Sequence, residues 1–187
     1  MGAIKVPLPA KLVCGVLFAA QRISQDEILR SLTRLGGPVD LLSVIRPFLW
    51  TDYYRQEMGQ NIHRFFVSFS RLFPADKLSD IKIKTNALEY RLSRSLSQRC
   101  VNLDPGYLSL SKVVLATTKS HAHRIYMGKG IYEEVTLRFQ KKRFVPLEWT
   151  YPDYRMGENL LFFESVRNAY YDQIQKKHGI SSLSRCV

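Results

Sequence analysis

Cysteine is scarce in this sequence, and no hydrophobic run is long enough to cross a bilayer. The three cysteines, Cys14, Cys100 and Cys186, are far apart and form no C-x-x-C pair. Neither a zinc knuckle nor a disulfide framework is indicated, and a reducing, cytoplasmic location is expected. The apolar run at residues 12–20 is much shorter than the roughly 20 residues of a transmembrane helix. It is interpreted as a buried first strand, and no membrane association is expected.

Acidic residues are also few: 16 Asp and Glu stand against 28 Lys and Arg, which gives the 187-residue chain a formal charge of +12. A basic surface concentrates negative ligands, so RNA and anionic small molecules such as nucleotides or phosphorylated metabolites are the expected partners. The charge does not choose among them, and the sequence names no protein partner. With 45% apolar and 24% charged residues, the composition predicts one globular domain over residues 1–187 and excludes a disordered or collagen-like chain.

Several familiar motifs are missing. The chain has no G-x-x-x-x-G-K-[ST], no G-x-G-x-x-G after the first strand and no G-x-S-x-G. A Walker phosphate loop, a Rossmann fingerprint and a hydrolase nucleophile elbow are therefore absent. Residues 66–69, Phe-Val-Ser-Phe, match the end of the RNA-recognition signature, but Arg64 and Phe65 depart from it. RNA binding is for this reason an alternative hypothesis.

Apolar periodicity and turn residues predict alternating strands and helices in the first part of the chain. A helix after the first strand begins at the capping box of residues 24–27 and ends at Gly36-Gly37. The other elements expected are β-rich segments at residues 39–49 and 61–73, helical turns at 51–59, a second helix at 74–97, a strand at 99–103 and a turn at Asp104-Pro105-Gly106. The order β-α-β-β-α-β predicts an α+β fold with a ferredoxin-like core.

The remaining residues predict an addition to that core. A strand is expected at residues 112–118, followed by a β-hairpin from residue 123 to residue 139 that turns at Gly128-Lys129-Gly130. Residues 144–147 can extend the sheet, and a terminal helix is predicted from residue 158 to about residue 177.

Four polar segments lie where strands are predicted to end or turn: residues 52–57, 102–107, 119–126 and 151–155. Such positions display functional side chains on a rigid scaffold. Five carboxylates could jointly hold a hard divalent cation such as Mg²⁺, the one cofactor considered: Asp52, Glu57, Asp104, Glu134 and Asp153. The alternative is that these carboxylates cap turns or form structural ion pairs.

The cations of these segments suit an anionic ligand. Lys119, Arg124 and Arg155 could offset phosphate charge, with arginine suited to a bidentate contact. His121-Ala122-His123 would put two imidazoles on one face of a strand, which is compatible with a metal or with acid-base chemistry at His123. On the second helix, Lys82, Asn86 and Glu89 form a polar ridge that is interpreted as a solvated face.

These residues lead to one first hypothesis and two alternatives. The first is a small enzyme or binding protein for a phosphorylated or nucleotide-like ligand, held in a pocket of carboxylate, Lys, His and Arg side chains. The catalytic candidates are Asp52, Glu57, Asp104, His123 and Asp153, and the ligand-binding candidates are Lys119, Arg124, Arg155, Tyr54 and Tyr107. The alternatives are a noncatalytic RNA-binding module and a protein-interaction adaptor. No motif names a reaction, so whether the protein is an enzyme is left open.

Five segments resemble a bacterial family known as domain of unknown function 4416. They are TDYYRQEMG at residues 51–59, KTNALE at 84–89, NLDPGYLSLSKVVLATTK at 102–119, HRIYMGKGIYEEVTL at 123–137 and WTYPDYR at 149–155. With the first strand they span nearly the whole chain. The resemblance implies no established activity and supplies no catalytic residues.

Overall fold

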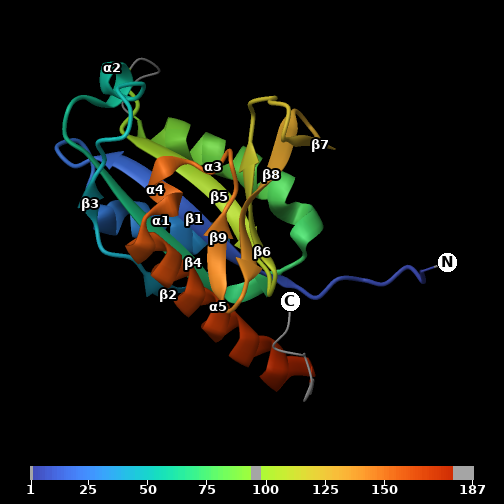
Figure 1. Ribbon diagram of the computed structural model, residues 1–187. Helices are drawn as coiled ribbons and strands as arrows, with labels where there is room; N and C mark the ends of the chain where they lie inside the picture. The colour runs from blue at the N-terminus through green and yellow to red at the C-terminus, as the bar shows by residue number, and fades with distance from the viewer. Residues whose placement is uncertain (1, 94–97, 179–187) are drawn as a thin grey trace.

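Residues 2–93 and 98–178 are described by a computed structural model, in which nine strands form one sheet with helices on both faces (Figure 1). All strand pairs in this part of the chain are antiparallel. Seven strands follow the order β2-β4-β1-β5-β6-β8-β7, with β3 beside β4 and β9 beside β8. The strands are β1 (Ala10–Ala19), β2 (Val39–Leu42), β3 (Arg46–Pro47), β4 (Ile62–Phe73), β5 (Val101–Leu108), β6 (Lys112–Thr117), β7 (Ile125–Gly128), β8 (Ile131–Gln140) and β9 (Arg143–Pro146).

The helices form two layers around the sheet. They are α1 (Gln25–Gly36), α2 (Arg55–Met58), α3 (Leu78–Leu92), α4 (Pro152–Arg155) and α5 (Gly157–His178), and a short 3₁₀ helix, Ala75–Lys77, precedes α3. Strand β1 is buried along its whole length, because strands flank both of its edges and helices cover both of its faces. The continuous apolar run that predicted a buried first strand is explained by this position.

Alternating side chains of β1 divide the core into two parts. Cys14 and Val16 pack with Ile28 of α1 and Leu88 of α3 on one face. On the opposite face Val13 packs in a cluster with side chains of α5, among them Phe163, Val166 and Ile174. Successive strand residues point to opposite faces of a sheet. A central strand that helices cover on both faces is therefore apolar on both of its faces. Figure 1 shows α5 crossing the face opposite to α1 and α3.

The start and end of the first helix are confirmed. The Oγ atom of Ser24 accepts a hydrogen bond of 3.3 Å from the backbone N–H of Glu27. Gly37 follows the helix with a φ of +91°, a value that glycine adopts without strain, and its N–H bonds to the carbonyl of Thr33. The hairpin of β7 and β8 around Gly128-Lys129-Gly130 and the terminal helix α5 are confirmed as well.

Three elements predicted in the first part of the chain differ in the structure. Asp104-Pro105-Gly106 lies inside β5 and is not a turn. The β-rich segment at residues 39–49 forms two short strands, β2 and β3, rather than one. The second helix begins four residues later than predicted, at Leu78, after the 3₁₀ helix, and its helical part ends at Leu92. Residues 94–97, which belonged to that prediction, and Cys186 lie outside the described residues.

The predicted α+β class is confirmed, but the sheet is larger than a four-stranded ferredoxin-like core. The strands β2, β4, β1 and β5 form one part of it, and the sheet continues from β5 through β6 and β8 to β7. One of the polar segments, residues 119–126, connects β6 to β7 in this extension. In the described ranges, none of the helices has both the length and the hydropathy that a membrane crossing requires.

Candidate functional site

Strands β5 and β6 form a fork. They pair only at Gly106, Tyr107 and Leu108, opposite residues 113–115. Strand β5 continues back to Val101 along β1, while β6 continues to Thr117 along β8. At the branch point the strands approach so closely that a Cβ atom on Gly106 would overlap the carbonyl oxygen of Val114. Glycine therefore allows the contact from which the two strands diverge.

Helix α3 occupies the open edge of β5 inside this fork. Lys82 Nζ donates to the carbonyl oxygen of Leu103 at 2.8 Å, and Glu89 Oε1 accepts from the N–H of Leu103 at 2.6 Å. Two backbone groups that would otherwise face the fork without a strand partner are thereby hydrogen-bonded. The interpretation of Lys82 and Glu89 as a solvated helix face is wrong, because they are only 6% and 7% exposed and face the sheet.

Pro105 is compatible with a strand because this edge of β5 has no strand partner. It follows Leu103 by two residues, so its nitrogen points to the same open side of β5. A proline there removes no ladder hydrogen bond, whereas it would do so between two paired strands. The prediction of a turn was wrong because proline also occurs at an unpaired strand edge, and glycine also occurs where two strands approach closely.

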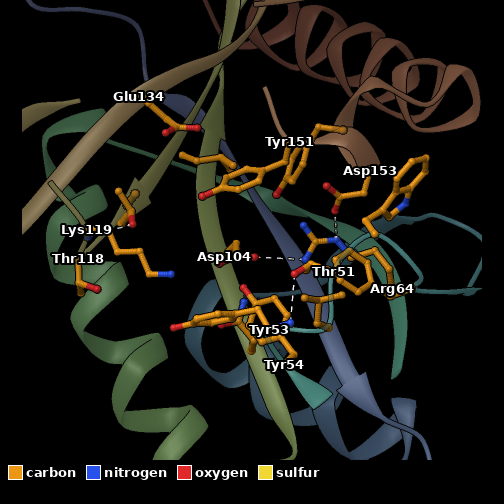
Figure 2. A pocket seen from close by; sticks show the side chains of 18 of the residues that line it. Thr51, Tyr53, Tyr54, Arg64, Asp104, Thr118, Lys119, Glu134, Tyr151 and Asp153 are labelled. Carbon is orange, nitrogen blue, oxygen red and sulfur yellow. Dashed lines mark hydrogen bonds and ion pairs between the residues drawn. The ribbon is translucent and has the colours of Figure 1, made fainter. Parts of the chain in front are cut away.

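The fork opens into a cavity of about 620 Å³. Its walls come from β5, β6, α3, α4 and the loops before α2 and after β6 (Figures 1 and 2). Six aromatic residues line it: Phe48, Trp50, Tyr53, Tyr54, Tyr151 and Tyr154. Five cationic residues also line the cavity: Arg64, Lys82, Arg99, Lys119 and Arg124. Its four acidic residues are Glu89, Asp104, Glu134 and Asp153. The volume and this mixture are typical of small-molecule sites.

Arg64 lies between two carboxylates at the inner wall. Its Nη1 donates to Asp104 Oδ2 at 3.2 Å, and its Nε lies 2.8 Å from Asp153 Oδ2 (Figure 2). The guanidinium also lies 4.8 Å from the ring centre of Phe66 and 5.1 Å from that of Tyr154. This buried cation is therefore held by two ion pairs and two aromatic rings.

Asp104 is the carboxylate of this group that remains accessible from the pocket, with 30% of its side chain exposed. Burial raises its pKa, but the positive charges of Arg64 and Lys82 and the side-chain contacts of Arg64 and Asn102 lower it by more. The pKa of Asp104 is consequently below its usual range, and the group is ionised at neutral pH. Glu89 behaves in the opposite way, because burial raises its pKa.

Arg124 and Glu134 form a second ion pair at the upper wall. Arg124 Nε donates to Glu134 Oε2 at 2.7 Å, and Arg124 Nη2 donates to the hydroxyl oxygen of Tyr151 at 3.0 Å. His123 Nε2 lies 3.1 Å from the same Glu134 oxygen, and His123 is not among the residues that line the cavity. The ion pair therefore fixes the position of Tyr151 at the pocket wall.

The predicted His-x-His strand is wrong, since residues 122–123 lie in a turn and β7 begins only at Ile125. The rings of His121 and His123 stack instead, with centres 6.0 Å apart, and His123 also stacks on Trp149 at 5.0 Å.

Lys119 projects into the pocket mouth and has no carboxylate within 4 Å in residues 2–93 and 98–178 (Figure 2). Its Nζ lies 4.5 Å from the ring centre of Tyr53. The backbone at Lys119 is held on both sides: Thr117 Oγ1 accepts from its N–H at 3.2 Å, and Arg124 Nη1 donates to its carbonyl oxygen at 3.0 Å. A fixed backbone thus presents an ammonium group that is available to a ligand.

Four buried polar atoms of pocket-lining residues have no hydrogen-bond partner within the described residues. They are Arg64 Nε, Arg99 Nε, Asn102 Nδ2 and the hydroxyl oxygen of Tyr154. Arg64 Nε is still within ion-pair distance of Asp153. Buried polar atoms without a partner are uncommon in folded proteins. Burial also raises the pKa of Tyr154 well above its ordinary value, so its hydroxyl is neutral and keeps its proton.

The structure brings five of the ten predicted site residues to the pocket: Asp104, Asp153, Lys119, Arg124 and Tyr54. Glu57 and His123 do not line it but contact residues that do, Glu57 through an ion pair of 2.9 Å with Arg99. Asp52, Arg155 and Tyr107 are outside it. Asp52 pairs with Arg55 on an exposed turn, Arg155 donates to backbone carbonyl groups, among them that of Thr150, and Tyr107 packs beside a cluster under α3.

The predicted cation site made of five carboxylates is not assembled. In the described part of the chain, no three His, Cys, Asp or Glu side chains lie together in a way that could hold a metal ion. Asp104 and Asp153 face Arg64, and Glu134 faces Arg124. With the pairs that Glu57 and Asp52 form, all five carboxylates contact guanidinium groups.

Sequence reasoning missed Arg64, Lys82, Glu89 and Asn102 as pocket residues. One signal was available: Arg64 is a charged residue in an apolar and aromatic strand, where it needs a buried partner. The aromatic residues of the same strand do not form an RNA-stacking surface, because Phe66 and Phe69 are 1% and 0% exposed.

A family model described as Domain of unknown function (DUF4416) matches residues 8–170. The match covers β1 to most of α5 and includes every residue that lines the pocket. No curated protein and no solved structure shows a significant match to the chain.

Proposed function

We propose that this chain, which belongs to the DUF4416 family, binds a phosphorylated, nucleotide-like small molecule in the cavity at the fork of β5 and β6. One observation carries the proposal: every carboxylate of the pocket is paired with an arginine, while Lys119 at the mouth has no carboxylate within 4 Å in the described residues. An anionic ligand would complete the pairing of charges. Lys119, with the neighbouring hydroxyl of Thr118, is our candidate for the phosphate contact.

The aromatic wall supports a ligand with a flat or apolar part. Tyr53 and Tyr54 lie on the loop before α2, and Tyr151 lies across the cavity before α4 (Figure 2). Tyr53 is 61% exposed, a large aromatic surface at the mouth of a pocket. Rings and sugars bind such surfaces through apolar contact and stacking.

For a catalytic role we propose Asp104 as the first candidate. It is ionised, is exposed to the pocket and uses only its Oδ2 atom in the contact with Arg64. Asp153 is only 7% exposed at its side chain and faces Arg64, so we assign it a positioning role. Arg124 holds Tyr151 and the loop of Lys119 in place.

The test is a thermal-unfolding and calorimetric titration of the full chain with nucleoside triphosphates, nucleoside monophosphates and inorganic phosphate, each with and without Mg²⁺. Ligand at about 100 times its dissociation constant should stabilise the fold by about 2.7 kcal/mol, a shift of several degrees. Lys119→Gln should weaken the binding of phosphorylated ligands about tenfold. Lys84→Gln, an exposed lysine of α3 outside the pocket, is the matched control and should bind like the wild type. Absence of binding to every phosphorylated ligand would overturn the proposal.

RNA binding and protein interaction remain alternatives. The net charge of +12 favours RNA, but no contact in the described residues favours it specifically. Binding of a short RNA that weakens steeply with salt and is unaffected by Lys119→Gln would favour RNA over the pocket ligand.

For the fold we propose that β1, α1, β2, β4, α3 and β5 form a ferredoxin-like unit to which the later strands were added. The strand order β2-β4-β1-β5, all antiparallel, and the placement of α1 and α3 on one face support this.

A further inference from the structure

The side-chain amide of Asn102 lies in the lining of the inner part of the pocket. Asn102 Oδ1 accepts from Arg99 Nη1 at 3.2 Å, which sets the orientation of the amide. Its Nδ2 meets no acceptor with normal hydrogen-bond geometry in the described residues, although Asn102 is only 7% exposed, and the amide lies beside the carboxylate of Asp104. Rotating the amide by 180° would turn its NH₂ toward the guanidinium, so Arg99 keeps the NH₂ on the side of Asp104.

Asp104 supplies an acceptor beside this donor. The two residues are two positions apart on β5, so their side chains lie on the same face of the strand. Arg64 binds only Asp104 Oδ2, and the carboxylate is 30% exposed. The inner pocket therefore holds an amide donor without a well-placed acceptor and an ionised acceptor side by side.

The surrounding charges restrict what can bind there. An anion at Asn102 Nδ2 would be close to the carboxylate of Asp104, and a cation at Asp104 would be close to Lys82 and Arg64, whose charges lower the pKa of Asp104. A hydroxyl group avoids both conflicts, because its oxygen accepts while its hydrogen donates. Adjacent hydroxyl groups can satisfy Asn102 and Asp104 together.

We propose that the inner pocket at Asn102 and Asp104 binds neighbouring hydroxyl groups of a sugar, so that the ligand class is a sugar phosphate, either free or as part of a nucleotide. This inference rests on the proposed function, in which Lys119 at the mouth contacts the phosphate. Lys82 keeps two N–H groups beyond the one given to Leu103 and can donate to the same hydroxyl oxygens.

The experiment compares ribose 5-phosphate, 2-deoxyribose 5-phosphate and inorganic phosphate by isothermal titration calorimetry on the full chain. Ribose 5-phosphate should bind about tenfold or more tightly than its deoxy analogue, because the missing hydroxyl leaves charged and buried groups without a partner. Asn102→Asp keeps an oxygen for Arg99 and removes the donor, so it should abolish most of this preference. Asn102→Ala should do the same if its unfolding midpoint shows that it folds.

The outcomes separate the two proposals. Equal affinity of the wild type for the ribose and deoxyribose phosphates would overturn the sugar inference and leave phosphate binding at Lys119 intact. A ribose preference that persists in both Asn102 variants would also overturn it. If none of the three compounds binds, the sugar inference falls, and the nucleotide titration described above decides whether the proposed function falls with it.

Discussion

The guanidinium of Arg64 lies above Gly15 of β1, in space that any larger residue would fill. A Cβ atom built on Gly15 would lie 2.9 Å from Arg64 Nη2 and 2.5 Å from the hydroxyl oxygen of Tyr154. The missing side chain thus creates the site in which Arg64 meets Asp104 and Asp153. Gly15 therefore leaves space for Arg64 at the inner wall of the pocket, within a strand that is otherwise packed by apolar side chains.

Gly15→Ala should lower the free energy of unfolding by about 1–3 kcal/mol, because the methyl group must displace Arg64 or Tyr154 from a packed arrangement. Gly157→Ala is a suitable control, since a Cβ there meets no atom within 4 Å. Urea unfolding of both variants and the wild type measures the difference. Equal stability of Gly15→Ala and wild type would contradict the close packing described for Arg64.

Tyr154→Phe should leave the free energy of unfolding unchanged or raise it, because the lost hydroxyl has no hydrogen-bond partner in the described residues. Tyr170→Phe provides the contrast: its hydroxyl donates to the carbonyl oxygen of Pro9 at 2.9 Å, and its loss should cost about 1 kcal/mol. Thermal and urea unfolding report both values. A larger loss for Tyr154→Phe than for Tyr170→Phe would mean that the hydroxyl of Tyr154 has a partner.

Lys82→Met should destabilise the fold by about 1 kcal/mol or more, because it retains an apolar stem but leaves the carbonyl of Leu103 without its donor. Lys84→Met changes an exposed residue of the same helix and should stay within about 0.5 kcal/mol of the wild type. Urea unfolding compares the two variants. Similar effects of the two substitutions would argue against α3 as the partner of the open edge of β5.

Asp104→Asn should lower the free energy of unfolding at pH 7 by about 1–2 kcal/mol, because Arg64 loses one of its two charged partners. The pKa of Asp104 is lower in the folded state than its usual value near 3.8. Its contribution to stability is accordingly present above that value and is lost as the pH falls through the folded-state pKa. The gap between wild type and Asp104→Asn should be smaller at pH 3 than at pH 7.

Urea unfolding at both pH values measures that gap. Asp172→Asn, which alters an exposed carboxylate of α5 without an ion pair in the described residues, should show no comparable change. A gap for Asp104→Asn that is as large at pH 3 as at pH 7 would contradict the assignment.

Local patterns predicted much of the chain correctly. The capping box at residues 24–27, the glycine turn between β7 and β8 and the apolar run of β1 depend on neighbouring residues, and each forms as expected. The turn at Pro105 and the solvated face at Lys82 were wrong, because both judgements depended on which strand lies beside β5.

The sequence by itself determined the α+β class, most helices and strands, the excess of positive charge and five residues that line the pocket, since these follow from composition, periodicity and polar segments at strand ends. Only the tertiary structure decided that β5 and β6 part at Gly106, that α3 fills the gap and that Arg64 meets Asp104 across 40 positions of sequence. Strand pairing is non-local: the register of β1 with β4 and β5 brings Arg64 and Asp104 together on one face. No spacing within a single segment contains that information.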